Sequence, residues 1–587
     1  MKLKLVVTAI LAIFLMAPLQ GNAQRKKKKE AVVKSNQYIE QEAEFYFIEG
    51  EKQYILEDYA KAVTNFRSSI QLVPTNDVAY FKLAQIYNTT NQLDAAKLSI
   101  IKAIDLNSEN AYYYLLAADI YTNANNLKEA TKYYEKLITK IPGEEHTFFQ
   151  LGAIYLYLQE YEKALATYQR AEDYFGINEQ ASVQKQKIYL KLNQIDKAVE
   201  EGQKLINKFP GNPKFVVMLA ELYASNNNNE EAILLTKNLL NSNSDVPGTR
   251  LFLADLYRKT KNLDQFESEL TRAFGDNKVL INAKINAVMK YMALLPDQRL
   301  ETMLPSLCNT IVATHPNDIN GHLLQGDVYS SFLEKQLVDV NEIDAFKTMA
   351  IQGYASYIKF DESKFNVWQN LLNLELQQND FDSVIVHGRL ALEVFPNQTW
   401  LYLVNGIAHS GNEEWNDAIY YFEEGLKRSA KNNQLLALFY GYLGDSYHGS
   451  GDHEKSDNAY DQALKIEPNN ELILNNYSYY LTLREQKLDK ANEMSLKLMR
   501  LNSDNLAYLD TYGWVQYKLG NYEEAKRVFE KVTGNQQANG ENYDHYGDVL
   551  YMLGEIENAK TQWLKAKELN SNIKNINKKI EQGKIIQ

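Results

Sequence analysis

Apolar residues recur three and four positions apart along almost the whole chain, which is the spacing of a helix that buries one face. In residues 77–110, Tyr80, Leu83 and Tyr87 follow this spacing. A polar stretch at 88–94 comes next, and a second run of the same spacing follows it. The pattern predicts two helices joined by a short turn.

This two-helix pattern repeats every 34 residues. Alanines occupy one slot of the second helix in six consecutive copies, at Ala62, Ala96, Ala130, Ala164, Ala198 and Ala232. Tyrosines form a parallel series in the first helix, at Tyr87, Tyr121, Tyr155, Tyr189, Tyr223 and Tyr257. A small side chain lets two helices approach closely, and a tyrosine fills the groove beside it. Each copy is therefore one structural module, and the chain is a linear array of modules.

The repeat register divides the chain. Units begin near residues 43, 77, 111, 145, 179, 213 and 247, and again near 365, 399, 437, 472, 506 and 540. Between these arrays the register slips, because Gly326 and Ala350 are 24 residues apart where other units use 12. About a dozen residues near 333–344 are extra, as a loop or as a lengthened helix. The predicted fold is all-α, a right-handed α-solenoid of about fifteen helix-turn-helix units in two arrays joined by an irregular segment.

The predicted boundaries follow from this register. They are a signal peptide at 1–23, a basic tail and lead-in at 24–42, an N-terminal array at 43–280, degenerate repeats with an insertion at 281–364, a C-terminal array at 365–570 and a capping helix at 571–587.

Residues 145–178 resemble the tetratricopeptide repeat. The matching positions are Phe148, Leu151, Gly152, Tyr155, Ala164, Tyr168 and Ala171, with Gly176 where the family pattern has proline. The resemblance implies that first helices line a concave wall that binds protein partners. Residues 508–525 and 545–566 look like the closing repeats of exported bacterial members of the family, which implies an envelope setting.

The N-terminus has the pattern of a cleavable export signal. Lys2 and Lys4 precede an apolar run, Leu5–Leu19, and small residues at 21–23 suit a signal peptidase. We therefore expect an exported protein, periplasmic or envelope-associated in a Gram-negative bacterium, with no integral membrane segment after cleavage. The basic run Arg25–Lys29 is either a solvated tail or a foothold on an anionic membrane or glycan.

Charge and cysteine content exclude several classes of protein. The chain has 63 Lys plus Arg against 75 Asp plus Glu, a net charge of -12, and one Cys. A disulfide framework and CxxC zinc sites are excluded, and the acidic excess argues against nucleic acid as a partner. Oligomeric state is left open.

Candidate chemistry is sparse, and we expect no enzyme, no cofactor and no metal. Cys308 occupies an aromatic slot of a degenerate unit, which favours a buried structural thiol. His448 and His453 fall near the turn of one unit, which favours plain surface side chains over a metal site. Every segment long enough to build a catalytic pocket already belongs to the repeat.

Protein binding through the concave groove is the function that the repeat predicts. The residues expected to face the groove are Phe47, Tyr54, Phe81, Asn88, Tyr112, Phe149, Asn373, Trp400, Asp445, Asn475, Asp510, Trp514 and Tyr551, with Glu51, Gln85, Asp119, His146, Gln369, Asp544 and Asp548 beside them. An alternative is that Phe47, Phe81 and Phe149 only pack against the neighbouring unit. The first unit has Phe47 and Glu51 where co-chaperones of the family carry a Lys and Asn clamp, so a chaperone-tail receptor is disfavoured.

Three hypotheses for function remain. The first is a non-enzymatic periplasmic scaffold that mediates protein–protein interactions in envelope assembly or maintenance. The second is a surface module that binds glycan or peptidoglycan through Trp400 and Trp514, helped by the basic run. The third is an enzyme with a site hidden in 281–364, which would need a carboxylate or thiol pair to converge there.

Overall fold

The computed structural model describes residues 36–242, 247–429, 432–570 and 572–586, and within these ranges the chain is helical with no strand. Helices α1 to α30 pair as fifteen hairpins, which confirms the predicted solenoid of helix-turn-helix units. The chain forms two compact units that divide between residues 246 and 247. The expected signal peptide and the basic run Arg25–Lys29 lie outside the described residues.

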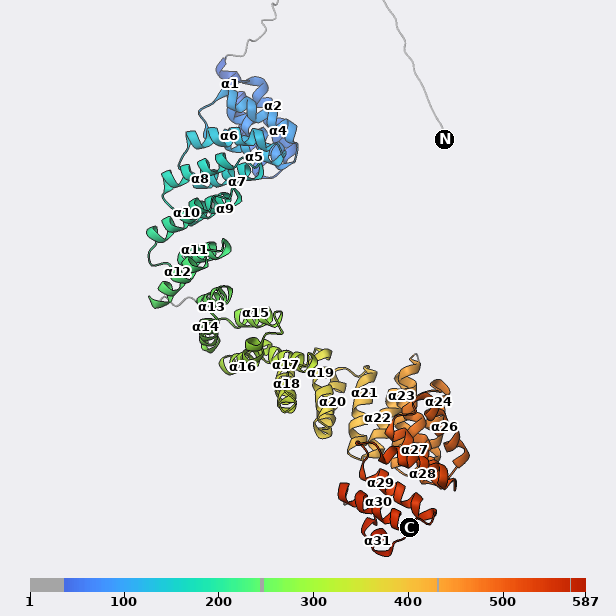
Figure 1. Cartoon of the computed structure of the whole chain (residues 1–587). Coiled ribbons are helices and arrows are strands. Elements are labelled where there is room, and N and C mark those ends of the chain that lie inside the picture. Colours follow the sequence, from blue (N-terminus) through green and yellow to red (C-terminus); the bar gives the residue numbers. More distant parts are fainter. Residues whose placement is uncertain (1–35, 243–246, 430–431, 571, 587) are drawn as a thin grey trace, which may run out of the picture. The chain divides into compact units, whose positions relative to one another are not determined.

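The first unit contains six hairpins, which pack in chain order (Figure 1). Their helices are α1 (Asn36–Ile55), α2 (Tyr59–Leu72), α3 (Asp77–Thr89), α4 (Leu93–Leu106), α5 (Ala111–Asn123), α6 (Leu127–Lys140), α7 (Glu145–Tyr157), α8 (Tyr161–Phe175), α9 (Glu179–Lys191), α10 (Ile195–Lys208), α11 (Pro213–Ser225) and α12 (Asn229–Asn241).

The second unit contains nine hairpins and a last short helix. Its helices are α13 (Thr249–Lys259), α14 (Leu263–Gly275), α15 (Ile281–Met292), α16 (Gln298–Thr314), α17 (Ile319–Glu334), α18 (Ile343–Ile358), α19 (Phe365–Gln377), α20 (Phe381–Val394), α21 (Thr399–Gly411), α22 (Trp415–Arg428), α23 (Asn433–Gly449), α24 (His453–Ile466), α25 (Glu471–Leu483), α26 (Leu488–Leu501), α27 (Leu506–Lys518), α28 (Tyr522–Thr533), α29 (Gly540–Met552), α30 (Ile556–Leu569) and α31 (Ile576–Gln582).

Each of the first seven hairpins turns through a residue in the left-handed conformation. Its φ lies between 54° and 64° at Glu57, Asn91, Asn125, Gln159, Asn193, Asn227 and Lys261. After α3, the amide of Gln92 donates to the carbonyl of Tyr87 at 2.7 Å, and the amide of Asn91 donates to that of Asn88 at 3.1 Å. These two bonds form a Schellman C-cap. Asparagine tolerates this conformation better than most residues, which accounts for its recurrence in the polar turns.

Small residues occupy the contact between the two helices of a hairpin. The alanines at 62, 96, 130, 164, 198 and 232 are all fully buried. A second small slot lies in the first helix, where a glycine faces an aromatic ring 16 residues later. A Cβ added to Gly152 would lie 2.6 Å from the ring of Tyr168, and one added to Gly406 would lie 2.3 Å from that of Phe422. The two helices can pack this closely only because the slot holds no side chain.

Replacing Ala164 with leucine should destabilise the first unit by about 1 to 3 kcal/mol, because the added methyl groups have no space between the two helices. Lys163 is exposed and pairs with Glu160 at 2.6 Å, so Lys163→Leu should be nearly neutral. Thermal unfolding of the two variants measures the difference. Equal shifts for both would contradict the assignment of buried and exposed faces.

The irregular segment contains both a longer helix and a loop. Helix α17 continues to Glu334, and eight residues, 335–342, then connect it to α18. A Cβ added to Gly353 of α18 would lie 2.5 Å from the backbone nitrogen of Gly326 of α17, so these two helices touch backbone to backbone. The boundaries proposed at 281 and 365 rest on repeat register and stay predictions.

The last described helix is α31. It follows α30 at the place where the first helix of another hairpin would begin. Ile576 is buried there, and Ile573 and Ile580 pack against the same cluster. This helix lies inside the segment where we expected a capping helix. Among the described helices, none combines the length and the apolar character needed to cross a bilayer.

Candidate functional site

The first helices of the last hairpins share a face of polar side chains, here called the first-helix wall. It is defined by Asp445 of α23, Asn476 of α25, Asp510 of α27, and Asp544 and Asp548 of α29. Asn476 Nδ2 donates to the carboxylate of Asp445 at 3.1 Å, and Asn542 Nδ2 donates to that of Asp510 at 2.8 Å. Because each bonded pair is about one repeat apart in sequence, the stacking of hairpins itself brings these groups together.

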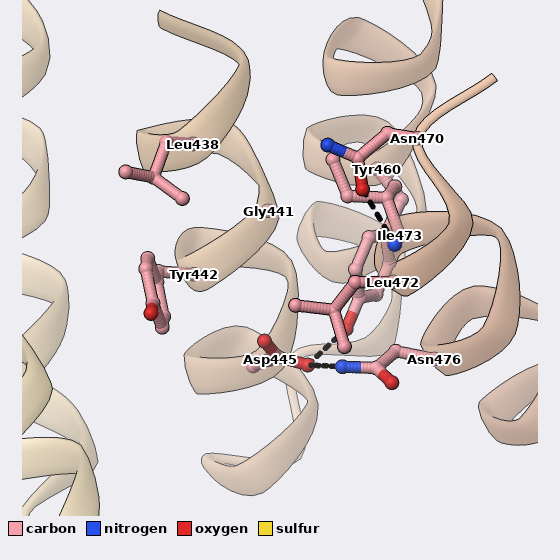
Figure 2. Close-up of a pocket in the computed structure, with 9 residues that line it drawn as sticks. All are labelled: Leu438, Gly441, Tyr442, Asp445, Tyr460, Asn470, Leu472, Ile473 and Asn476. Atoms are coloured by element: carbon pink, nitrogen blue, oxygen red, sulfur yellow. Dashed lines mark hydrogen bonds between the residues drawn. The ribbon is translucent and has the colours of Figure 1, made fainter. Parts of the chain in front are cut away.

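A small cavity opens in this wall between α23 and α25 (Figure 2). It is lined by Leu438, Gly441, Tyr442, Asp445, Tyr460, Asn470, Leu472, Ile473 and Asn476. Its volume is about 40 Å³, far below the several hundred Å³ of a small-molecule site. This space stays open because Gly441 has no side chain. A Cβ added there would lie 3.3 Å from Ile473 and would fill part of the space. The space suits the tip of one apolar side chain, and the exposed Leu472 lies at its edge.

Asp445 is one of the residues that line this cavity. Burial raises its pKa, while hydrogen bonds from Tyr460, Asn476 and Tyr480 oppose part of that rise. Figure 2 shows Tyr460 and Asn476 both directed at one carboxylate oxygen. Asp445 is thus held by donors from the following helices and forms a fixed acceptor beside an apolar space.

Trp514 of α27 lies in a stack of rings. Its ring centroid is 4.6 Å from that of Tyr517 and 4.0 Å from that of His545. Trp514 is buried, and its Nε1 has no hydrogen-bond partner among the described residues. Burial alone would lower the pKa of His545, but the carboxylate of Asp510, 3.2 Å from its Nδ1, and other acids nearby raise it above the usual value. The ring stack therefore adjoins the hydrogen-bonded pair of His545 and Asp510.

The end of the wall binds an ammonium group from the same chain. Lys579 of α31 lies 2.8 to 2.9 Å from the carboxylate oxygens of Asp544 and Asp548. The indole nitrogen of Trp563 donates to Asp548 at 2.9 Å. Asp544 and Asp548, expected to face partners, are therefore occupied by α31.

Most of the predicted groove residues of the first unit contact other first-unit residues. The ring of Phe47 lies 5.5 Å from Phe66, that of Phe81 lies 4.9 Å from Tyr113, and that of Phe149 lies 5.8 Å from Tyr168. Phe81 therefore packs against the neighbouring hairpin, as the alternative states, whereas the rings of Phe47 and Phe149 pack on the second helix of their own hairpin. Their binding role stays a prediction.

The remaining first-unit residues are more accessible or polar. The ammonium of Lys82 is 5.1 Å from the ring centroid of Tyr54, and Asn88 accepts a hydrogen bond of 3.0 Å from Asn123. Tyr112 is exposed.

Four other predicted residues belong to the second unit. Asn373 is exposed, and Asn475 is partly buried and donates to Asn476 at 3.4 Å. Trp400 packs edge-on to Phe365 at 6.2 Å, and the ring of Tyr551 is 6.1 Å from that of Trp563.

The expectation that His448 is a plain surface side chain is wrong. His448 lies in the last turn of α23, and its ring stacks on Tyr480 at 3.8 Å. His453 begins α24, with its ring 5.1 Å from that of His448. Burial, the neighbouring His453 and Arg484 together lower the pKa of His448 to about 4.

This neutral ring predicts a pH dependence. His448 is charged below about pH 6.5 in the unfolded chain but only below about 4 in the folded chain. Its contribution to stability is therefore complete above pH 6.5 and is lost as the pH falls towards 4, by about 1 to 2 kcal/mol, because solvent around the partly exposed ring screens part of the effect. Urea unfolding of wild type and of His448→Gln, each at about pH 7.5 and about pH 4.5, measures this loss of stability. A variant as sensitive to pH as wild type would contradict it.

Two other groups bear on chemistry. Cys308 is fully buried, as expected, and burial raises the pKa of its thiol. In the part of the chain that the structure describes, His409, Glu414 and Asp417 have ligand atoms within 4.8 Å of one another. Glu414 already accepts a hydrogen bond from His409 at 2.6 Å, and both acids are exposed. This arrangement is a hydrogen bond between a buried histidine and an exposed glutamate, and exposed acids of this kind are common without a metal ion.

The stacked hairpins and the first-helix wall are typical of one class of protein, the helical-repeat scaffolds for protein–protein interactions. Five segments match the family model described as tetratricopeptide repeat, at 78–110, 111–139, 145–174, 437–470 and 507–539. The chain thus contains tetratricopeptide repeats in these five segments. Proteins of this family are generally non-catalytic scaffolds.

Parts of this chain are similar to known proteins. The TPR repeat-containing protein PA4667 of Pseudomonas aeruginosa is 30% identical over 132 residues, which are 22% of this chain and 22% of that protein. The chain thus matches about a fifth of that relative's length. The structure of Naa15/Naa10 bound to HypK-THB aligns over 92% of this chain and 86% of that one, with 12% identity and a TM-score of 0.41. A tetratricopeptide repeat protein from Parabacteroides merdae aligns over 43% of this chain and 98% of that one, with 14% identity and a TM-score of 0.35.

Proposed function

We propose that this chain is a non-enzymatic periplasmic scaffold that holds partner proteins during assembly or maintenance of the cell envelope. The observation that carries the proposal is the cavity in the first-helix wall, where a fixed carboxyl group adjoins an apolar space of side-chain size. A cavity with these features suits a protein segment that inserts one apolar side chain. The basic and apolar pattern before residue 24 supports export.

Binding through the wall is tested with Leu472, whose exposed side chain edges the cavity. Crosslinked pull-down from periplasmic extract should recover a partner with wild type and lose it with Leu472→Glu. Tyr420 is equally exposed on the second helix α22, so Tyr420→Glu is the matched control and should retain the partner. Failure of wild type to recover any protein would count against a scaffold.

Export is tested separately. We expect the protein in the periplasmic fraction, with a mature N-terminus at Gln24 when the purified chain is sequenced. A cytoplasmic protein that retains residues 1–23 would contradict the proposed location. It would leave the proposal that the first-helix wall binds a partner unaffected.

The glycan-binding hypothesis has less support, because Trp514 is buried and its ring is stacked with those of Tyr517 and His545. Trp400 is partly buried and meets Phe365 edge-on. Only the basic run Arg25–Lys29 favours this function. Sedimentation with purified sacculi that is lost when this run is neutralised would revive it.

A further inference from the structure

The outer face of α1 carries an apolar stripe that no described helix covers. Phe45, Ile48 and Ile55 are 63%, 59% and 76% exposed. Spacings of three and seven residues place them along one side of the helix. On the opposite side, Ala43 and Gly50 are buried against α2.

The later hairpins show that the position of Phe45 is covered when another hairpin precedes it, whereas residues at the position of Ile55, such as Thr89 and Tyr157, are exposed there too. The residues at the position of Phe45 in the next five hairpins are Ala79, Tyr113, Thr147, Ala181 and Phe215, and all are buried. A side chain at this position is therefore covered throughout the rest of the first unit. At the other end of the chain, α31 covers the last hairpin and buries Ile576. Solenoids carry a polar outer face where no further repeat packs, and among the described helices α1 presents an apolar one.

The charges on α1 restrict what can cover the stripe. The helix has five glutamates and a single lysine. Glu49 is bonded to Lys52, and Glu51 pairs with Lys82 at 3.0 Å, whereas Glu40 and Glu44 are exposed. Acidic flanks repel an anionic membrane and a second α1 alike, and they attract lysines.

We propose that the outer face of α1 is a second interaction surface, independent of the first-helix wall, and that it receives an amphipathic, lysine-rich helix of a partner protein. This helix takes the place that the second helix of a preceding hairpin would fill. Helix α6 illustrates the fit, since it packs against the first helix α7. It buries Tyr134, Leu137 and Ile138 while exposing lysines.

A synthetic peptide copying residues 127–140, capped at both ends and fluorescently labelled, is therefore a suitable probe. Titrated with the full chain, it should bind saturably, as measured by fluorescence anisotropy. The double variant Phe45→Glu with Ile48→Glu should weaken binding at least about tenfold, because two carboxylates then replace the apolar contact. Leu98→Glu, at a comparably exposed apolar residue of the same unit, should bind as wild type does.

Three outcomes would overturn the proposal. The first is no saturable binding by wild type while circular dichroism shows that the full chain is folded. The second is equal binding by wild type and the double variant. The third is a dimer in sedimentation velocity that the double variant abolishes, which would show that a second copy of the chain covers α1.

Discussion

Replacing Lys185 with methionine should lower the stability of the first unit by about 3 to 5 kcal/mol. Lys185 of α9 is buried between two buried carboxylates, Glu172 of α8 and Glu201 of α10, and lies 2.9 Å from the latter. Its ammonium also donates to Gln169 at 3.0 Å. Without this cation, Glu172 remains in the interior without a counter-charge, and Glu201 keeps only the partly exposed Lys204 at 2.7 Å. An uncompensated buried carboxylate is far costlier than the loss of a surface pair.

Hydrogen–deuterium exchange of peptides from α8 to α10 measures this effect where it arises. Lys187→Met, at an exposed position on the same helix, is the control and should exchange as wild type does. Combining Lys185→Met with Glu172→Gln and Glu201→Gln should recover most of the protection, because no charge is then left buried. Normal protection in Lys185→Met alone would contradict the role of the ion pair.

Gly152→Leu should destabilise the same unit by more than about 3 kcal/mol. A Cβ at this position would already lie 2.6 Å from the ring of Tyr168, and leucine adds three further carbons to that collision. Tyr168 is itself buried and cannot move aside without displacing α8.

The control for this change is Gly143→Leu. Nothing lies within 4 Å of a Cβ added to Gly143, which is exposed between hairpins. Urea unfolding followed by circular dichroism should show a large loss for Gly152→Leu and almost none for Gly143→Leu. Similar midpoints for the two would mean that the helices of a hairpin do not need the empty slot.

Much of the fold was predictable because one spacing is repeated many times. The alanine series alone places the contact inside each hairpin, and all six alanines are buried. The left-handed turn residues could also have been found, since Asn91, Asn125, Asn193 and Asn227 fit the same 34-residue period. The insertion near 333–344 was located by counting, but its division between helix and loop depends on contacts that spacing does not report.

The wall was less predictable. The sequence assigns Asp445, Asp510 and Trp514 to one face of their helices, but it does not fix how one hairpin rotates on the next. That rotation decides whether Trp514 faces solvent or stacks between Tyr517 and His545. Partners such as Asn476 for Asp445 follow the repeat length, and a search for polar pairs about one repeat apart would have found them.

The central claim is that the first-helix wall near Asp445 contacts a protein partner. The most direct test places a photo-crosslinking amino acid at Leu472 in living cells, with Tyr420 on α22 as the comparison site. The account predicts a discrete protein adduct at 472, absent at 420. No adduct at 472, or the same adducts at both sites, would contradict it.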